Sequence, residues 1–324
     1  MKTKTRYAGN MFGRKKKEGE IKKKKNIKVL IKNNWQLYLL FLPVFVYFLI
    51  FEYFPMYGVQ VAFKDFKAVD GILGSEWVGF KHFKDFFNAY YFKRLLANTL
   101  LLNVYNLLWS FPVPIVLALM LNQIRNDKTK RFIQTTIYMP HFISTVVLAG
   151  MLYIFLSPSS GIFNYVRTAM GLPVVDFMAK KEAFRTIYIA SGIWQGAGFS
   201  SILFIACLAG VDPTLYEAAE IDGASIWQKM RHIDLPSLIP TAVMTFILNC
   251  GKVMANNTSK VLVLQTAGNI PTSDIIGVYV YNVGLGTGQF SYTAAIGLFT
   301  NLVNFILIIT VNKISKKVAG LGMF

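Results

Sequence analysis

The sequence predicts an all-α integral membrane protein that crosses the membrane with six helices. Of the 324 residues, 54% are hydrophobic and 15% are charged, and the mean hydropathy of +0.44 is too high for a soluble chain. Several continuous apolar runs approach the roughly 20 residues that a helix needs to cross a bilayer. These runs do not alternate like the strands of a membrane β-barrel, so helices are the better interpretation.

Six apolar segments provide the predicted spans, and Pro43, Pro112 and Pro140 fall inside three of them. A membrane helix tolerates a proline where neighbouring groups satisfy the freed backbone carbonyl. The spans are expected at residues 36–54, 95–121, 132–156, 187–208, 238–255 and 292–311. External loops are then expected at 64–94, 158–186 and 256–291.

Basic residues set the expected orientation of the spans. Residues 1–35 contain 13 basic and two acidic residues, a charge of +11 out of the net +18. The loop 125–131 is also basic, and Lys313, Lys316 and Lys317 follow the last span. Because cytoplasmic segments are enriched in lysine and arginine, we expect a multi-pass membrane protein with both termini in the cytoplasm.

Two kinds of partner suit the basic tail at 1–35, anionic lipid and nucleic acid. Attraction to anionic headgroups contributes roughly 1 kcal/mol per basic residue near the membrane. No aromatic residue between Arg14 and Lys32 is available to stack on a base, so lipid is the expected partner rather than nucleic acid. The long charged region and the lack of an A-x-A site also distinguish the tail from a cleavable secretory signal.

These features divide the chain into four parts. The basic cytoplasmic tail at 1–35 is followed by the first transmembrane helix and its external loop at 36–94. A transmembrane domain at 95–314 contains a polar cytoplasmic segment at 211–236, and a short cytoplasmic tail at 315–324 follows.

Aromatic residues recur at helical spacing in the first external loop, with charged residues between them. They are Phe80, Phe83, Phe86, Phe87, Tyr90 and Tyr91. This pattern predicts an amphipathic helix that lies at the outer membrane interface. Because aromatic rings also stack on sugars, a role in substrate contact is the alternative.

The segment 211–236 is too polar to span lipid, and it carries clear signals for two short helices. Asp212 suits an N-cap position with Pro213 as the first helical residue. Gly223 suits the position just beyond the end of that helix, where a positive φ is required. The first helix of the segment is therefore expected between Pro213 and Gly223.

Ser225 and Gln228 have the spacing of a capping box for a second short helix, which is expected to stop before Pro236. The segment then forms a helix-turn-helix elbow between the fourth and fifth spans. Small residues on it would let a partner backbone approach closely, and Glu217 and Asp222 offer charges for pairing. The alternative is an ordinary loop packed under its own helical bundle.

The elbow resembles the EAA motif of ABC importer permeases, a pattern of Glu-Ala-Ala, three residues, Gly and a terminal Leu-Pro. The resemblance implies a type I permease fold with six transmembrane helices, in which the elbow is a coupling helix that docks on an ATP-binding subunit. The matching residues, which the resemblance assigns to ATPase coupling, are Glu217, Ala218, Ala219, Asp222, Gly223, Ala224, Leu235 and Pro236.

Further stretches resemble the maltose-permease-like carbohydrate permeases, in particular the subgroup that handles large, often polysaccharide-derived saccharides. They are Pro55-Met56-Tyr57-Gly58, Phe63-Lys64-Asp65, Trp77-Val78-Gly79-Phe80, Asn98-Thr99-Leu100, Met139-Pro140-His141-Phe142-Ile143-Ser144 and Tyr279-Val280-Tyr281. The stretch Asn256-Asn257-Thr258-Ser259 departs from the Gly-Phe-Glu-like sequence expected there. The function implied is the translocation of an oligosaccharide by one permease subunit of an ATP-driven importer.

The resemblance also implies the partners of this chain. They are a second homologous permease, two copies of an ATP-binding subunit and an extracellular solute-binding protein. ATP and Mg would be bound by the ATP-binding subunit, and no cofactor is expected in this chain.

The sequence contains no residues that indicate an enzyme. It has no G-x-x-x-x-G-K-[ST] phosphate loop, and the glycine-rich stretch 284–288 lacks the lysine. No Ser-His-Asp arrangement or metal-ligand spacing is present, and His82, His141 and His232 are scattered. We therefore assign no catalytic residue and no metal site.

Two other classes of protein remain as alternatives. An ion-coupled secondary transporter normally carries an acidic residue within the membrane, and Glu52 near the outer end of the first span is the only candidate. A membrane-anchored scaffold or signalling protein would account for the basic tail but would leave the elbow unexplained.

Polar residues inside the spans are the candidates for substrate contact, because such residues are costly in lipid and tend to face a cavity. Their alternative role is hydrogen bonding between helices. A sugar needs hydrogen-bonding groups and an aromatic face, and the candidates that supply them are Trp194, Gln195, Asn249 and Asn301.

Overall fold

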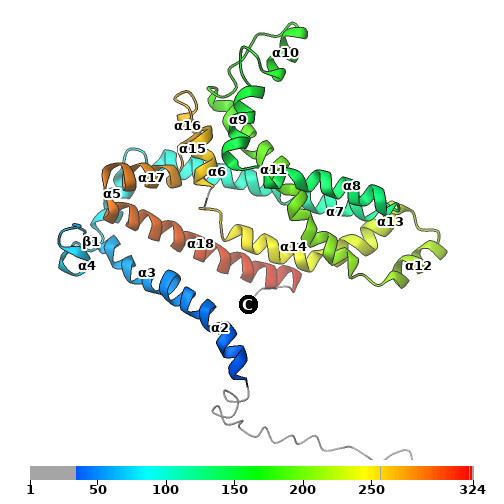
Figure 1. The fold of residues 1–324 in the computed structure, drawn as a ribbon, viewed down its shortest axis with the longest axis horizontal. Coiled ribbons are helices and arrows are strands. Elements are labelled where there is room, and N and C mark those ends of the chain that lie inside the picture. Colours follow the sequence, from blue (N-terminus) through cyan, green and yellow to red (C-terminus); the bar gives the residue numbers. More distant parts are fainter. Residues whose placement is uncertain (1–33, 256, 321, 323–324) are drawn as a thin grey trace, which may run out of the picture. The chain divides into compact units, whose positions relative to one another are not determined.

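The computed structural model describes residues 34–255, 257–320 and 322. The basic tail predicted at 1–35 therefore lies almost entirely outside the described residues. The chain forms two compact units, Met1–Gly58 and Val59–Phe324, and each is described by itself. Almost all of the described structure is helical (Figure 1).

The described residues of the first unit form a single run of helix. It begins with α2 (Trp35–Phe48), continues through the π-helical η1 (Leu49–Tyr53) and α3 (Phe54–Met56), and runs on into the 3₁₀ helix η2 (Tyr57–Phe63). Residues 35–63 are long and apolar enough to span a membrane, which confirms the first predicted span and extends it. Pro43 lies inside α2, as predicted for this span.

Four more helical runs in the second unit are long and apolar enough to cross a membrane. They are Phe92–Asn122 (α6, Phe92–Ser110, and α7, Pro112–Asn122), α11 (Lys181–Ala209), Ile226–Cys250 and α18 (Phe290–Ala319). Helix α11 packs on both α6 and α7, and α14 (Leu235–Cys250) packs on α18 (Figure 1). The run that starts at Phe92 is interrupted at Phe111, directly before Pro112, because Pro112 has no N–H to donate to the preceding turn.

The third predicted span is broken rather than continuous. Helix α8 (Asp127–Tyr138) passes through a 3₁₀ turn, η3 (Met139–Phe142), into α9 (Thr145–Phe155), and the axis bends by 97°. Pro140 lacks the N–H that would continue the helix, and the Ser144 hydroxyl caps the new helix by accepting from the Val147 N–H at 3.3 Å. The described residues thus hold five long spans, or six if this bent pair is one.

The elbow's second helix does not stop before Pro236, so that prediction is wrong. Helix α13 (Ile226–Lys229) continues through a π-helical turn, η4 (Met230–Asp234), directly into α14. Pro236 lies in the first turn of α14, where the wider hydrogen bonding of η4 makes its missing N–H harmless. The fifth span therefore begins well before residue 238, and it ends at Cys250 rather than at 255.

The first external segment contains the predicted amphipathic helix, α5 (Lys81–Asn88), and Phe80, Phe87, Tyr90 and Tyr91 are exposed on or beside it. Phe86 is only 1% exposed and its ring packs against those of Phe92, Tyr292 and Phe299. Preceding it are α4 (Gly71–Gly74) and a two-stranded antiparallel sheet of β1 (Lys64–Asp65) and β2 (Glu76–Trp77). Phe86 and Phe87 thus hold α5 on α18, and a position at the outer membrane interface stays a prediction for the exposed aromatic residues.

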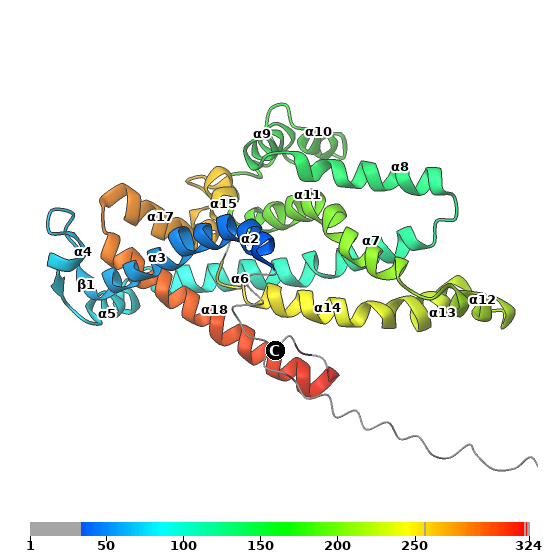
Figure 2. The ribbon, with the colours of Figure 1, turned by 60° about the horizontal axis from the view of Figure 1, so that its bottom comes forward.

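The two remaining predicted loops are also largely helical. The first contains α10 (Ile162–Ala169), and the second contains α15 (Thr258–Leu264), α16 (Ile270–Ser273) and α17 (Ile276–Thr287). Within the second unit, α12 and α13 lie at one end and α5 and α17 at the other (Figure 2). Both stretches lie between the long spans, as predicted, and in them Gly and Pro separate short helices.

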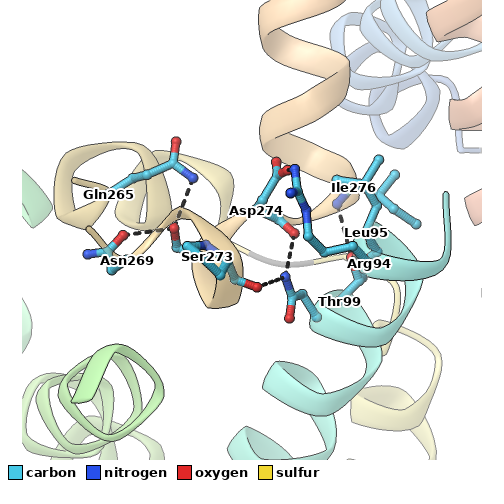
Figure 3. Close-up of polar contacts among 10 residues, drawn as sticks. Arg94, Leu95, Thr99, Gln265, Asn269, Ser273, Asp274 and Ile276 are labelled. Atoms are coloured by element: carbon cyan, nitrogen blue, oxygen red, sulfur yellow. Dashed lines mark hydrogen bonds and ion pairs between the residues drawn. The ribbon is translucent and has the colours of Figure 1, made fainter. Parts of the chain in front are cut away.

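Polar contacts fasten α15–α17 to the start of α6. Figure 3 shows Arg94 paired with Asp274, and the Thr99 hydroxyl accepting a hydrogen bond from the Ile276 N–H, at 3.0 Å. Thr99 is fully buried. These contacts fix the start of α17 against α6 and close this end of the second unit.

Replacing Thr99 by valine is expected to destabilise this end of the unit. Valine matches threonine in shape, so the change leaves the buried Ile276 N–H without its acceptor at a cost of about 1–3 kcal/mol. Thermal unfolding of the detergent-purified protein should show a midpoint lower by several degrees. Thr310→Val on exposed α18 is the control, since that hydroxyl donates only to Ile306 O of its own helix. Equal midpoints for the two variants would contradict the assigned role of Thr99.

Candidate coupling and transport sites

The first helix of the elbow, α12 (Pro213–Ile221), has the predicted caps. An Asp212 carboxylate oxygen accepts a hydrogen bond from the Thr214 N–H at 3.0 Å, and this bond lowers the pKa of Asp212. Gly223 has a φ of +72°, and the Ala224 N–H donates to Ala219 O at 2.8 Å. This left-handed glycine and its closing bond sharply turn the chain out of α12.

The second half of the elbow is fixed by the predicted capping box. The Gln228 side chain accepts from the Ser225 N–H at 2.7 Å, and the Gln228 N–H donates to the Ser225 hydroxyl at 3.3 Å. Lys229 Nζ lies 2.8 Å from a Glu220 carboxylate oxygen and so joins the two halves of the elbow. The hydrogen bond from Lys229 lowers the pKa of Glu220.

The tip of the elbow presents both polar and apolar groups to solvent. Ile221 is 87% exposed and Trp227 is 78% exposed. A shallow cavity of about 320 Å³ lies between the two halves of the elbow, and four of its lining residues are the predicted coupling residues Ala219, Asp222, Gly223 and Ala224. Glu217 and Ala218 are exposed on α12, whereas Leu235 and Pro236 lie on the first turn of α14 and line no part of this cavity.

A buried carboxylate that the sequence reasoning missed joins the elbow to the bundle. Asp234 is fully buried and accepts hydrogen bonds from the Tyr216 hydroxyl, from Gln123 Nε2 at 2.7 Å and from Asn122 Nδ2 at 3.3 Å. It thereby ties α12 to the end of α7 and to the start of α14. The available signal was an acidic residue directly before Leu235-Pro236. Burial and the bond to Asp234 raise the pKa of Tyr216 to about 12, so its hydroxyl remains a donor at neutral pH.

Three adjoining cavities of about 290, 650 and 350 Å³ lie among α6, α7, α11, α14 and the segment that follows α14. All three include Ser110 and Ser200 in their lining. Lys260 lines the first of them, and Lys252 lines the second and third. No aspartate or glutamate lines any of the three cavities among the described residues.

The structure brings two of the four predicted substrate residues to these cavities. Gln195 lines the first cavity, where its Nε2 also donates to Ile143 O at 2.7 Å, and Asn249 lines the second and third. Trp194 is 47% exposed and lines none of the three, and Asn301 is exposed on α18 and lines none of them. The sequence reasoning also missed Lys260, because it lies outside the predicted spans.

Lys260 is an unusual cavity residue because it is only 4% exposed. Its Nζ donates to Tyr188 O at 2.9 Å and lies 4.8 Å from the centre of the Tyr188 ring. Burial lowers the pKa of Lys260 to about 8, so the ammonium still carries its charge at neutral pH. A Cβ atom added at Gly192 would lie 3.2 Å from this Nζ, so the glycine leaves room for the ammonium.

Comparison with known proteins assigns the class. Residues 110–320 match the family of binding-protein-dependent transport system inner membrane components. The chain belongs to this family: it is a sugar permease of the ABC importer class and a multi-pass protein of the cytoplasmic membrane, without catalytic activity of its own. This family assignment takes the place of the two alternatives, an ion-coupled secondary transporter and a membrane-anchored scaffold or signalling protein.

Two relatives confirm the predicted resemblance to carbohydrate permeases. The chain is 42% identical to the polygalacturonan/rhamnogalacturonan transport system permease protein YteP of Bacillus subtilis (strain 168) over 94% of this chain and 95% of that protein. It is 41% identical to protein LplB of the same organism, over 91% of this chain and 92% of that protein.

A solved structure confirms the fold. The chain superposes on a chain of a bacterial ABC transporter involved in the import of the acidic polysaccharide alginate, with a TM-score of 0.83 and 37% identity. The match covers 90% of this chain and 99% of that chain. This chain superposes equally well, with a TM-score of 0.83 and 37% identity, on a chain of a bacterial alginate ABC transporter in complex with alginate pentasaccharide-bound periplasmic protein. The predicted type I permease fold is therefore correct.

Removing the Tyr216 hydroxyl is expected to loosen the elbow. Tyr216→Phe deletes one of three hydrogen bonds to the buried Asp234 carboxylate, and a hydrogen bond to a charged group contributes about 1.5–3 kcal/mol. Limited proteolysis of the membrane-embedded protein should cut the elbow faster than in the unaltered protein. Tyr281→Phe, at an exposed tyrosine of α17, provides the control. Identical cleavage of both variants would show that the Tyr216 bond does not hold α12.

Proposed function

We propose that this chain is the permease subunit through which an ATP-driven importer moves an oligosaccharide across the cytoplasmic membrane. The observation that carries the proposal is the capped, solvent-exposed elbow at one end of the bundle, with small residues around its cavity. A surface of this kind suits docking on another protein, here a separate ATP-hydrolysing subunit. The names of YteP and of the alginate transporter support a saccharide chain as the cargo.

The Asp234 contacts give the elbow a route to the membrane helices. A displacement of α12 by a docked ATPase would be passed through Tyr216 to Asp234, and from there to α7 and α14. Buried charged hydrogen bonds are costly to break, so the joined helices would move together. Helices α7 and α14 both line the largest of the three cavities, which would change shape as a result.

The remaining partners follow from the same proposal. A second homologous permease would complete the pathway, because apolar side chains such as Leu302, Phe305 and Ile306 remain exposed on α18. Two copies of the ATP-binding subunit would bind ATP and Mg, and an extracellular solute-binding protein would deliver the saccharide, as the complex of the alginate transporter with its periplasmic protein supports. The elbow and both termini would then be cytoplasmic, with the basic tail against anionic lipid.

Gly223→Val tests the docking of the elbow. A β-branched residue strains the chain at φ +72° and would misdirect the turn between α12 and α13. We expect normal amounts of protein in the membrane, loss of oligosaccharide uptake, and loss of the ATPase subunit when the complex is purified through a tag on this chain.

Gly171→Val is the matched control, since Gly171 follows α10 in the predicted external loop 158–186, has a φ of +73° and also has open space around it. That variant should keep the ATPase subunit. Retention of ATPase and uptake by Gly223→Val would refute the coupling role.

The orientation can be tested with a membrane-impermeant thiol reagent on intact cells. In a background without Cys207 and Cys250, a cysteine introduced at Gly74 should react, whereas one introduced at Lys128 should react only after the cells are broken. Both positions are exposed in the structure, so a difference reports the side of the membrane. Labelling of the Lys128 position in intact cells would reverse the topology.

A further inference from the structure

The charged residues that line the three cavities are all positive. Two lysines contribute to it, and the other polar groups are neutral, among them Asn106, Gln195 and Asn249. None of the ion pairs among the described residues includes Lys252 or Lys260. The cavities therefore hold positive charge that the described part of this chain does not neutralise.

Lys260 is the stronger of the two charges as a binding group. An ammonium group has three N–H donors, and here it is removed from water with one carbonyl acceptor and one aromatic ring as its described partners. Burying a cation without a counter-charge is costly, and the cost falls when an anion enters the same low-dielectric space. Lys260 therefore gains more from an anionic ligand than from a neutral one.

The surroundings of Lys260 are open on the cavity side. Gly192 on α11 has no side chain to cover the ammonium, and Gly196 lines the same cavity. Ser110 and Asn257 line both the first and the third cavity, and Lys252 lines the third. A ligand that extends from one cavity to the next would thus meet both lysines, with hydroxyl and amide groups between them for its own hydroxyls.

We propose that Lys260 and Lys252 form a binding site for the carboxylate groups of an acidic oligosaccharide, that is, a chain containing uronic acids, on its passage through this permease. The proposal rests on the proposed transport function and adds the charge of the substrate and the residues that select it. Sugar carboxylates are ionised at neutral pH and pair with lysine ammonium groups. A neutral oligosaccharide would use the amides and hydroxyls but would leave both charges unpaired.

Equilibrium binding to the whole complex tests the site. The complex is purified through a tag on this chain, with the subunits that co-purify, and placed in phosphatidylcholine nanodiscs without nucleotide. The probes are radiolabelled tetragalacturonate and tetramannuronate, each compared with its fully methyl-esterified form, which keeps the size and hydroxyls but removes the charge. The complex should bind at least one acid about tenfold or more tightly than its ester, and the preference should fall as salt rises.

Substitutions assign the preference to the two lysines. Lys260→Gln and Lys252→Gln should each weaken binding of the acid about tenfold and leave binding of the ester unchanged. Lys252→Arg, at an exposed side chain, should restore the preference. Lys93→Gln, at an exposed lysine of α6 that lines none of the three cavities, should behave like the unaltered complex.

Binding of the ester distinguishes misfolding from loss of charge, because a misfolded variant would bind neither acid nor ester. If Lys260→Gln yields no complex, the pair Lys252→Gln and Lys252→Arg still decides the question. Equal affinity for acid and ester, equal losses for both in the glutamine variants, or no binding of either acid would overturn the proposal. If one of these outcomes is found but the complex still imports neutral maltotetraose with ATP, the carboxylate site is wrong and the proposed transport function stands. A complex that imports no oligosaccharide and retains no ATPase would remove both.

Discussion

The buried Asp234 carboxylate is the contact on which the arrangement of this permease depends. It lies where α7, α12 and α14 meet, and it receives hydrogen bonds from side chains on two of the three helices while belonging to the turn that leads into the third. A carboxylate withdrawn from water requires all of these donors, because each one lost leaves charge unsatisfied. The elbow consequently cannot shift without either taking the membrane helices with it or exposing that charge.

The elbow and the cavity residue Lys260 lie in different parts of the second unit. The elbow lies at one end of the second unit, whereas Lys260 lies beyond the last turn of α14, on the helical segment that Arg94, Asp274 and Thr99 help to fasten at the other end. Helix α14 extends from the elbow to the cavities and contributes to both. Under the proposed function, residues that line the cavities can therefore change without altering the exposed surface of the elbow.

Much of this organisation follows from short-range sequence patterns. The spans were predictable because lipid demands long apolar helices, and the caps of Asp212, Gly223 and Ser225 because capping involves residues only a few positions apart. The break near Pro140 has a local cause, but whether a membrane helix tolerates such a proline depends on neighbouring groups. The depth of Asp234 was not predictable, since it depends on packing between distant segments. Lys260 was missed for the same reason: its partner Tyr188 is 72 residues away.

The π-helical turn η4 changes the direction in which the side chains of α13 point about the helix axis. A π turn accommodates one more residue than an α turn, and each residue of an α-helix advances the side chains by about 100°. Trp227 and the other side chains of α13 therefore face a direction about 100° away from the one that an unbroken α-helix leading into α14 would give them. The direction of the α13 side chains about the helix axis is thus set by a single surplus residue, and deletion of one residue within 230–234 would rotate them without altering any residue of α13.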